Sequence, residues 1–422
     1  MIKPIAIYLP QFHPIPENDE AWGEGFTEWS NVKKAEPLFE GHYQPHIPHD
    51  DVGYYDLRNP DVLIKQAAMA KEHGIYGFAY YHYWFNGKLL LETPMDNMLK
   101  TGNPDFPFCY IWANENWTKR WDGLDNEVII KQEYSFQDDL EHIQYLCKNV
   151  FNDKRYITID EKPVFIVYRT ELFPDIKRTV QIWREEVKKY GFKDIYLVRV
   201  EHFVKNLDPK DIGFDSAMEF APDGDCVEGH HYIENHVVID YTTVVSNMLL
   251  KMKPYKYFHC IFPTWDNTPR RKQIGGTIYV NTDLDVFTFF LEHQLVSTLK
   301  KFDNHDERLV FINAWNEWGE GCHIEPDKKV GYQYLNICKQ VLYNSLTLSP
   351  VISNYLNHVK EKYNNLEERY SNLLKENNKL KKICCDNDTK IKQLYFSKDY
   401  KLGQYLLKPF RWIKNILYPL QK

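Results

Sequence analysis

Residues 309–326 have the sequence LVFINAWNEWGEGCHIEP, an apolar run that changes abruptly into polar and aromatic residues. The first four residues have the pattern of a strand that is buried on both faces, as in a parallel sheet. Glu317 and Glu320 follow where that strand must stop, among glycines that let the backbone turn sharply. The stretch therefore predicts a buried strand whose C-terminal end carries two neighbouring carboxylates.

Seven further apolar runs precede this one and alternate with helical patterns. The runs span residues 4–10, 75–82, 107–113, 162–168, 194–200, 214–220 and 257–263. Helices are predicted at 59–73, 137–151 and 175–190, and the segment 22–46, rich in Pro, Gly and aromatic residues, is predicted to be a loop. Eight strands alternating with helices predict an α/β fold, the (β/α)8 TIM barrel.

A doubly wound open sheet is the structural alternative. That fold usually has a glycine-rich phosphate-binding turn after its first strand. Here the first strand is followed by Gln11, Phe12 and His13, which form no such turn. The barrel is therefore preferred.

In a barrel of this kind all strands end at one rim, so polar residues at the strand ends converge there. The residues expected at this rim are His13, His82, Asn114, Glu115, Arg169, Glu201, Glu219, Asp266, Glu317 and Glu320. Paired carboxylates suit glycosidic chemistry, in which one group protonates a departing oxygen and another assists attack at the anomeric carbon. Glu317 and Glu320 are the catalytic candidates.

Sugar-binding candidates are chosen for hydrogen-bonding side chains and for indole faces. They are His82, Asn114, Glu115, Trp117, Glu219, Trp315 and Trp318. The plainer interpretation is that the two glutamates are solvated loop acids and that Trp315 and Trp318 belong to the core. Of the two carboxylates, the one nearer a Trp should have its pKa raised by desolvation and serve as the acid.

No metal and no cofactor are expected. The tripeptide Asp223-Gly224-Asp225 is like the acidic pair that holds a metal in nucleotide-sugar transferases, but such tripeptides are common by chance. The net charge of −7 argues against binding to nucleic acid. The eight cysteines form no CxxC pair, and no secretory signal is recognisable, so a cytoplasmic protein with reduced thiols is expected.

The composition changes after residue 346, the expected end of the barrel domain, 1–346. Residues 350–386 carry apolar positions at alternating intervals of four and three, which predict a coiled coil and hence a homo-oligomer. A single long helix lying on the barrel is the alternative. Residues 395–422 combine a local charge of +5 with many aromatic and aliphatic residues, which predicts an amphipathic segment in an anionic membrane interface, on the inner face of the cell membrane.

Four short motifs carry a family resemblance. They are YLPQFHP at 8–14, GFTEW at 25–29, WANENW at 112–117 and NEWGEG at 316–321. Together they resemble the WbsX-like family, whose members are described as glycosyltransferases of surface-polysaccharide clusters. That family is similar in fold to glycoside hydrolase family 99, the endo-α-mannosidases and endo-α-mannanases.

The resemblance implies a barrel that cleaves or transfers α-linked sugars with retention of configuration. By the match, Glu317 would take the proton from the sugar's own 2-hydroxyl, giving a 1,2-anhydro sugar. Glu320 would protonate the departing oxygen and then activate water. This chain has Gly319 where those relatives carry a bulkier residue.

Three functions follow as hypotheses. The first is a hydrolase or transglycosylase acting on a bacterial O-antigen or capsule-type polysaccharide. The second is a glycosyltransferase that uses a sugar-nucleotide or lipid-linked donor at the cytoplasmic membrane face. The third is a non-catalytic carbohydrate-binding scaffold.

Overall fold

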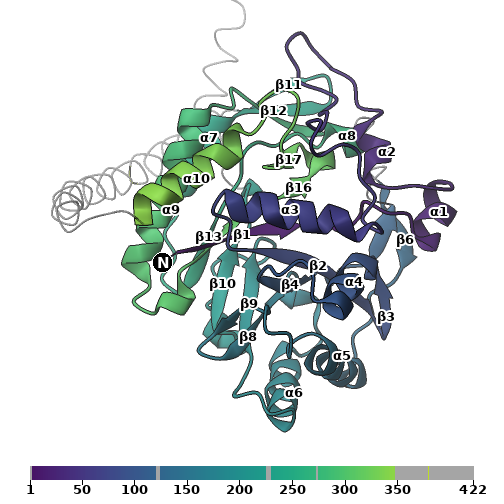
Figure 1. The fold of residues 1–422 in the computed structure, drawn as a ribbon, viewed down its shortest axis with the longest axis vertical. Coiled ribbons are helices and arrows are strands. Elements are labelled where there is room, and N and C mark those ends of the chain that lie inside the picture. The colour runs from purple at the N-terminus through teal and green to yellow at the C-terminus, as the bar shows by residue number, and fades with distance from the viewer. Residues whose placement is uncertain (1, 120–123, 225–229, 272–273, 347–378, 380–422) are drawn as a thin grey trace, which may run out of the picture. The chain divides into compact units, whose positions relative to one another are not determined.

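The computed structural model describes residues 2–119, 124–224, 230–271, 274–346 and the single residue 379 (Figure 1). Residues 1–346 form one compact unit. Apart from residue 379, the predicted coiled coil at 350–386 and the predicted membrane-interface segment at 395–422 lie outside the described ranges.

Eight parallel strands close into a barrel, which confirms the predicted (β/α)8 fold (Figure 1). They are β1 (Lys3–Tyr8), β2 (Gly77–Phe85), β4 (Phe108–Trp112), β8 (Lys162–Val167), β9 (Tyr196–Glu201), β10 (Ser216–Glu219), β13 (Tyr257–Ile261) and β15 (Leu309–Ile312). Each strand pairs with its successor, and β1 pairs with both β2 and β15. Ile5, for example, lies opposite Gly77 on one side and Phe311 on the other. All eight predicted apolar runs therefore become barrel strands.

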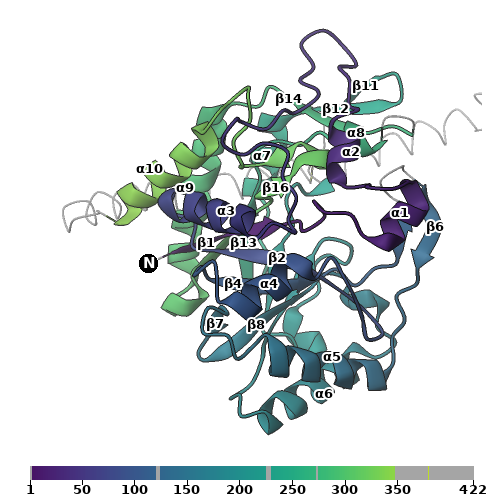
Figure 2. The same ribbon diagram turned by 45° about the vertical axis from the view of Figure 1, so that its right-hand side comes forward.

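The longer helices lie outside the strands, and α9 and α10 run side by side in both ribbon views (Figure 2). The seven helices meant are α3 (Pro60–Glu72), α4 (Thr93–Thr101), α5 (Phe136–Asn149), α6 (Ile176–Lys189), α7 (Tyr241–Leu249), α9 (Leu284–Lys301) and α10 (Gln333–Leu346). Helices α3, α5 and α6 begin after Asn59, Ser135 and Asp175, whose side chains accept hydrogen bonds from backbone amides of the first turn. The three predicted helices are confirmed to within two residues. No helix among the described residues has the length and apolar character that crossing a bilayer requires.

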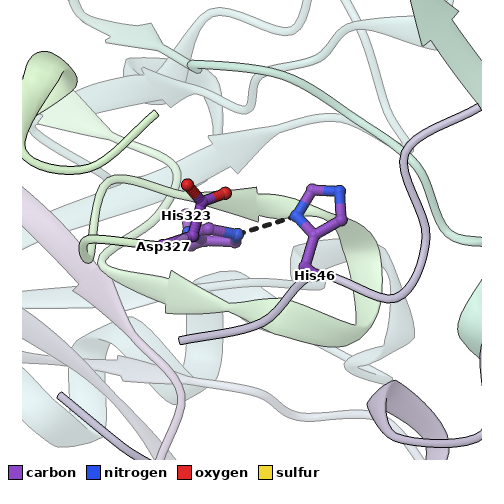
Figure 3. A group of neighbouring side chains, drawn as sticks. All are labelled: His46, His323 and Asp327. Carbon is purple, nitrogen blue, oxygen red and sulfur yellow. Dashed lines mark hydrogen bonds between the residues drawn. The ribbon is translucent and has the colours of Figure 1, made fainter. Parts of the chain in front are cut away.

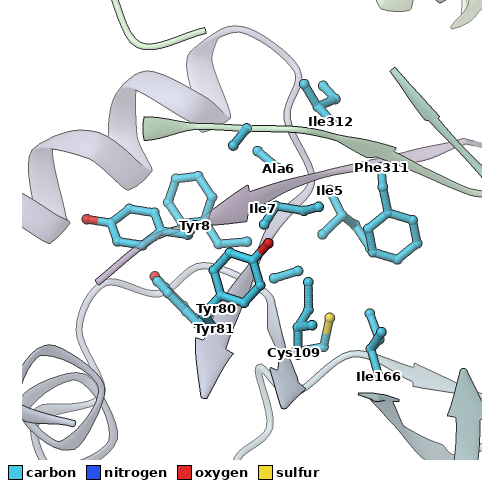
Figure 4. Packing of buried hydrophobic residues seen from close by; sticks show 14 of the residues in the cluster. Ile5, Ala6, Ile7, Tyr8, Tyr80, Tyr81, Cys109, Ile166, Phe311 and Ile312 are labelled. Carbon is cyan, nitrogen blue, oxygen red and sulfur yellow. The ribbon is translucent and has the colours of Figure 1, made fainter. Parts of the chain in front are cut away.

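Side chains of the barrel strands form a continuous apolar core (Figure 4). Ile5, Ile7, Ile166 and Phe311 are fully buried within it. Alternate residues point the other way, toward the helices: Tyr8 on β1 donates a hydrogen bond from its hydroxyl to Gln66 of α3 over 2.6 Å. This alternation decides which side chain at the end of each strand reaches the barrel mouth.

Loops after the strands carry short elements at the barrel mouth. They are α1 (Pro16–Trp22), α2 (Glu28–Val32), α8 (Thr268–Arg271), β3 (Lys88–Leu90), β5 (Trp117–Lys119), β6 (Leu124–Ile130), β11 (His231–Ile233), β12 (His236–Asp240), β14 (Thr277–Val280), β16 (Asn316–Glu317) and β17 (Cys322–His323). The strand β7 (Thr158–Ile159) pairs with the start of β8. The segment 22–46 was predicted to be a loop, and α2 corrects that prediction, because Thr27 and Ser30 form a reciprocal capping box that starts a helix there.

Candidate active site

A cavity of about 620 Å³ lies at the C-terminal ends of the barrel strands. Residues at or after all eight strand ends contribute to its wall. Its aromatic lining consists of Tyr81, Tyr83, Tyr168, Phe203, Phe220, Tyr232, Trp265 and Tyr279. The acidic lining consists of Glu115, Glu317 and Glu320. A concave site with apolar walls and a few convergent polar groups is the usual form of a small-ligand site.

A short hairpin positions Glu317 and Glu320. Strand β16 pairs with β17, and the 3₁₀ turn η6 (Trp318–Glu320) connects them. Asn316 fastens this hairpin to the end of β1, since its side chain accepts a hydrogen bond from the Leu9 amide over 2.8 Å and donates one to the Leu9 carbonyl over 3.0 Å. The carboxylates therefore stand on a braced turn and not on a free loop.

One guanidinium, that of Arg270 on α8, holds three carboxylates. Its Nη2 donates to Glu317 Oε2, its Nη1 to Glu320 Oε1 and its Nε to Glu28 Oε1, each over 2.7 Å. Burial alone would lower the pKa of Arg270, but the charges of Glu28, Glu320 and Glu317 raise it well above its usual value. The side chain of Arg270 thus remains a fixed cation between the two catalytic candidates.

The two catalytic candidates differ in their surroundings. The side chain of Glu317 is 7% exposed, and burial raises its pKa to about 8, a shift that Arg270 opposes and the charges of Glu320 and Glu28 reinforce. The side chain of Glu320 is 23% exposed and lines the same cavity. Glu317 is therefore the drier of the two carboxylates.

Position 319, between the two carboxylates in the sequence, requires glycine for a steric reason. A Cβ atom at this position would lie 1.5 Å from Glu28 Oε1 and 2.8 Å from Arg270 Nε. No side chain fits while Glu28 keeps its contact with Arg270. The bulkier residue expected in the family's hydrolase relatives is incompatible with this arrangement.

Asp266, which was expected at the rim, contacts the backbone of the hairpin and does not line the cavity. Its backbone amide donates to the Glu320 carbonyl over 2.7 Å. Its carboxylate accepts hydrogen bonds from His42 and Gln44, each over 2.7 Å, and from the hydroxyl of Thr268 over 2.6 Å. Burial raises the pKa of Asp266, but these donors outweigh burial and lower it.

Trp315 and Trp318 do not reach the cavity. Both are fully buried, and their indole N–H groups donate to Glu325 over 3.2 and 2.9 Å. Tyr55 and Gln66 donate to the same carboxylate over 2.9 and 2.7 Å. The expectation that these indoles stack on a sugar is wrong in this structure, because neither has a free face.

His82 and Asn114 also serve the scaffold. His82 lies on the outer side of β2, where its Nε2 is 2.9 Å from His142 Nε2 of α5, and burial lowers its pKa to about 3. Its neighbours Tyr81 and Tyr83 point into the cavity instead. The Asn114 side chain donates to the Arg169 carbonyl and accepts from the Arg169 amide, each over 2.8 Å, which ties the ends of β4 and β8 together.

The remaining sugar-binding candidates divide between the cavity and its surroundings. Trp117 is buried, with its indole N–H on Asn18 Oδ1 at 2.9 Å. Glu219 accepts from Lys253 and His259, each over 3.0 Å, and although burial opposes this, their charges lower its pKa to about 2. Glu115 lines the cavity and pairs with Arg169. Of the residues expected at the rim, only Glu115, Glu317 and Glu320 line this cavity.

The sequence interpretation missed Arg270, Glu28 and the tyrosines of β2. Glu28 lies in the motif GFTEW, which was quoted for the resemblance but given no role. The alternating aromatic run of β2 signalled that Tyr81 and Tyr83 share one face, although not which face is the inner one. In the acidic tripeptide, Asp223 forms ion pairs with Lys205 and Lys251, and Asp225 lies outside the described residues.

Comparisons with known proteins give the same family as the motifs. A family model described as "Glycosyltransferase WbsX" matches residues 4–338. Proteins named WxcX from two strains of Xanthomonas campestris pv. campestris are each 41% identical over 346 residues, which is 80% of this chain and 49% of theirs. The chain thus spans about half the length of the curated relatives it matches.

Solved structures share the fold at low identity. The GH99 endo-α-mannosidase from Bacteroides thetaiotaomicron aligns in two solved structures with a TM-score of 0.51 and identities of 13% and 14%, over 81% of this chain and 96% of that one. A glycoside hydrolase-like protein aligns with a TM-score of 0.52 and 14% identity, over 81% and 93% of the two chains. At such identities the likeness is one of fold.

Proposed function

This chain belongs to the WbsX glycosyltransferase family, and we propose that its barrel cleaves or transfers α-linked sugars of a bacterial surface polysaccharide. The family implies a carbohydrate-active enzyme of polysaccharide metabolism. The observation that carries the finer proposal is the pairing of Glu317 and Glu320 on one guanidinium, within an aromatic-lined cavity at the barrel mouth. Aromatic rings such as Trp265, Tyr81 and Tyr83 would pack against the apolar faces of sugar rings.

Glu317 would act as the base toward the sugar's 2-hydroxyl. Once deprotonated, a carboxylate whose pKa is raised is a stronger base than an ordinary one, and burial raises the pKa of Glu317 to about 8. As Glu317 takes the proton, O2 attacks C1 and the bond from C1 to the departing oxygen breaks. The product of this step is a 1,2-anhydro sugar. The rule that the drier carboxylate is the acid would reverse the two roles, so the rule and the family resemblance disagree here.

Glu320 would act as the acid and then as the base. It gives its proton to the departing oxygen, and later takes a proton from water or from an acceptor hydroxyl that attacks C1, while Glu317 returns its proton to O2. Its partly exposed side chain suits this exchange of molecules. Arg270 holds the Glu320 carboxylate at the cavity wall through a hydrogen bond of 2.7 Å.

The experiment uses the full-length protein and a panel of α-linked oligosaccharides, with and without sugar nucleotides. Release of reducing ends with retained configuration, followed by NMR, is the expected result. Donor-dependent extension would favour the glycosyltransferase alternative. Three nitrogen-bearing side chains in the cavity wall support that alternative, since they could contact an anionic donor: His202, His230 and Arg271. Binding without turnover would favour the scaffold.

Two variants distinguish loss of the acid role of Glu320 from a loss of activity through misfolding. Glu320→Gln should lower turnover by about 10²–10⁴-fold while substrate still binds. Glu133→Gln, an exposed position, is the matched control and should leave turnover unchanged. Full activity of Glu320→Gln would eliminate the acid role.

A further inference from the structure

A second group of titratable side chains lies behind the catalytic hairpin, outside the wall of the 620 Å³ cavity. His46 comes from the loop between α2 and α3, His323 from β17 and Asp327 from the loop before α10 (Figure 3). All three are buried, with 6%, 2% and 2% of their surfaces exposed. One potential ligand atom from each lies within 4.8 Å of the other two.

We propose that His46, His323 and Asp327 bind a divalent transition-metal ion, for which zinc is the best match. Two imidazole nitrogens and one carboxylate oxygen form a typical ligand set for zinc. The two nitrogens, His46 Nδ1 and His323 Nε2, are 2.9 Å apart (Figure 3). A small outward movement of the two rings would give the separation that two ligands of one zinc ion require, about 3.3 Å for bonds of about 2.0 Å in a tetrahedron.

The surroundings already orient these side chains as a metal site requires. His323 donates from Nδ1 to the Glu325 carbonyl over 2.9 Å, so its Nε2 carries the lone pair that faces His46. Asp327 Oδ1 accepts from the backbone amides of Lys329 and Val330 over 2.9 and 2.7 Å, which fixes the plane of the carboxylate. Hydrogen bonds of these two kinds are the usual outer support of metal ligands.

His46 is the ligand that must adjust. In the described arrangement its Nδ1 hydrogen points at His323, and binding of a metal requires the tautomer with the hydrogen on Nε2. No proton need leave the protein for this change, because neutral imidazole has one hydrogen in either tautomer.

A separate cavity gives access to the site. It has a volume of about 410 Å³, and His46, His323 and Asp327 line it together with His42 and Asp266. An ion can therefore enter, and a water molecule can complete a fourth position. An entry path, a satisfied outer shell and a suitable ligand set are the checks that a candidate metal site should pass.

The metal would join three segments that support the catalytic hairpin. The loop that carries His46 also carries His42 and Gln44, which hold the Asp266 carboxylate. The ring of Trp318 in the hairpin stacks on His323 at 3.7 Å between centroids. The expected role is structural, and this inference does not depend on the proposed reaction.

The first test measures binding directly. Full-length protein without a histidine tag is treated with a chelator, incubated with zinc chloride and desalted, and zinc is measured by mass spectrometry. One zinc per chain and a raised melting temperature are expected. Asp327→Asn and His46→Gln should weaken zinc binding at least about tenfold, whereas His49→Gln, at a nearby partly exposed imidazole outside the ligand group, should not change it.

The second test identifies the ligands without any variant. X-ray absorption at the zinc edge should show nitrogen and oxygen neighbours at about 2.0–2.1 Å with the signature of imidazole. A sulfur shell would place the zinc on cysteine and overturn the proposal. Failure of the wild-type chain to retain zinc would also overturn it, leaving the two imidazoles as a hydrogen-bonded pair.

Discussion

Arg270 donates from Nη2 to Oε2 of Glu317 over 2.7 Å at the barrel mouth, where the two side chains are 11% and 7% exposed. The same guanidinium also holds Glu320 and Glu28. One positive charge therefore offsets three carboxylates that would otherwise repel one another in a region of low dielectric. Arg270 is also the charge that opposes the effect of burial on the pKa of Glu317.

Replacing Arg270 should shift the pH dependence of the reaction. Arg270 lowers the pKa of Glu317 against the effect of burial, so Arg270→Gln should raise that pKa further above about 8. A base must be deprotonated to act, so the acidic limb of the kcat/KM profile should move to higher pH. Activity at pH 7 should fall about tenfold for each unit of that movement. An unchanged profile would show that Glu317 is not the base.

Gly319 and Glu28 should behave as a coupled pair. Gly319→Ala brings a Cβ to 1.5 Å from Glu28 Oε1, so Glu28 must leave Arg270, and unfolding free energy should fall by about 1–3 kcal/mol. In a Glu28→Ala background the same substitution should cost less, because only the contact with Arg270 Nε at 2.8 Å remains. Denaturant titration of the four chains measures this coupling.

Gly224→Ala is the control for the same experiment. A Cβ at Gly224 would meet nothing within 4 Å, so the stability of this variant should match that of the wild type. Equal costs of Gly319→Ala in both backgrounds would contradict the steric explanation.

Glu325→Gln should destabilise the hairpin. Each oxygen of Glu325 accepts from one indole, Oε1 from Trp315 and Oε2 from Trp318. An amide nitrogen must face one of these donors whichever way it is turned, and an indole cannot accept. A loss of about 1–3 kcal/mol in thermal or urea unfolding is expected, and an exposed substitution, Glu133→Gln, should cost nothing. A stable Glu325→Gln chain would mean that the carboxyl group carries a proton and already acts as a donor.

Deletion of residues 395–422 should release the protein from anionic vesicles. The prediction rests on the sequence of that segment, which has a charge of +5 and interleaved aromatic residues. Sedimentation with vesicles that contain phosphatidylserine, compared with neutral vesicles, is the measurement. Equal sedimentation of the full and shortened chains would remove the membrane proposal.

The barrel strands were predictable because each is an apolar run of suitable length between helical patterns. The carboxylates Glu317 and Glu320 were predictable for a similar reason, since they follow directly after such a run. Which face of each strand points into the barrel was not predictable in the same way. Period-two alternation separates His82 from Tyr81 and Tyr83, but the inner face is fixed only by closure of the barrel.

Arg270 could not be found from sequence because its role depends on the path of a long loop. It lies nine residues after the end of β13, on a helix of four residues with no distinctive pattern. The indoles failed as predictions for another reason. Trp315 and Trp318 are of the residue type that often stacks on sugar rings, but both are buried and donate hydrogen bonds from their indole N–H groups to the carboxylate of Glu325.

The first strand of the barrel completes its pairing only with the last strand. β1 pairs with β15, and Glu28, near the start of the chain, meets Arg270 and the hairpin near residue 320. During synthesis the edge of β1 that pairs with β15 therefore stays unfilled until some three hundred residues have emerged from the ribosome, although the other edge can pair earlier with β2. A nascent chain with an apolar open edge is a substrate for chaperones, and a chain released early would lack the carboxylate pair as well as the closed wall.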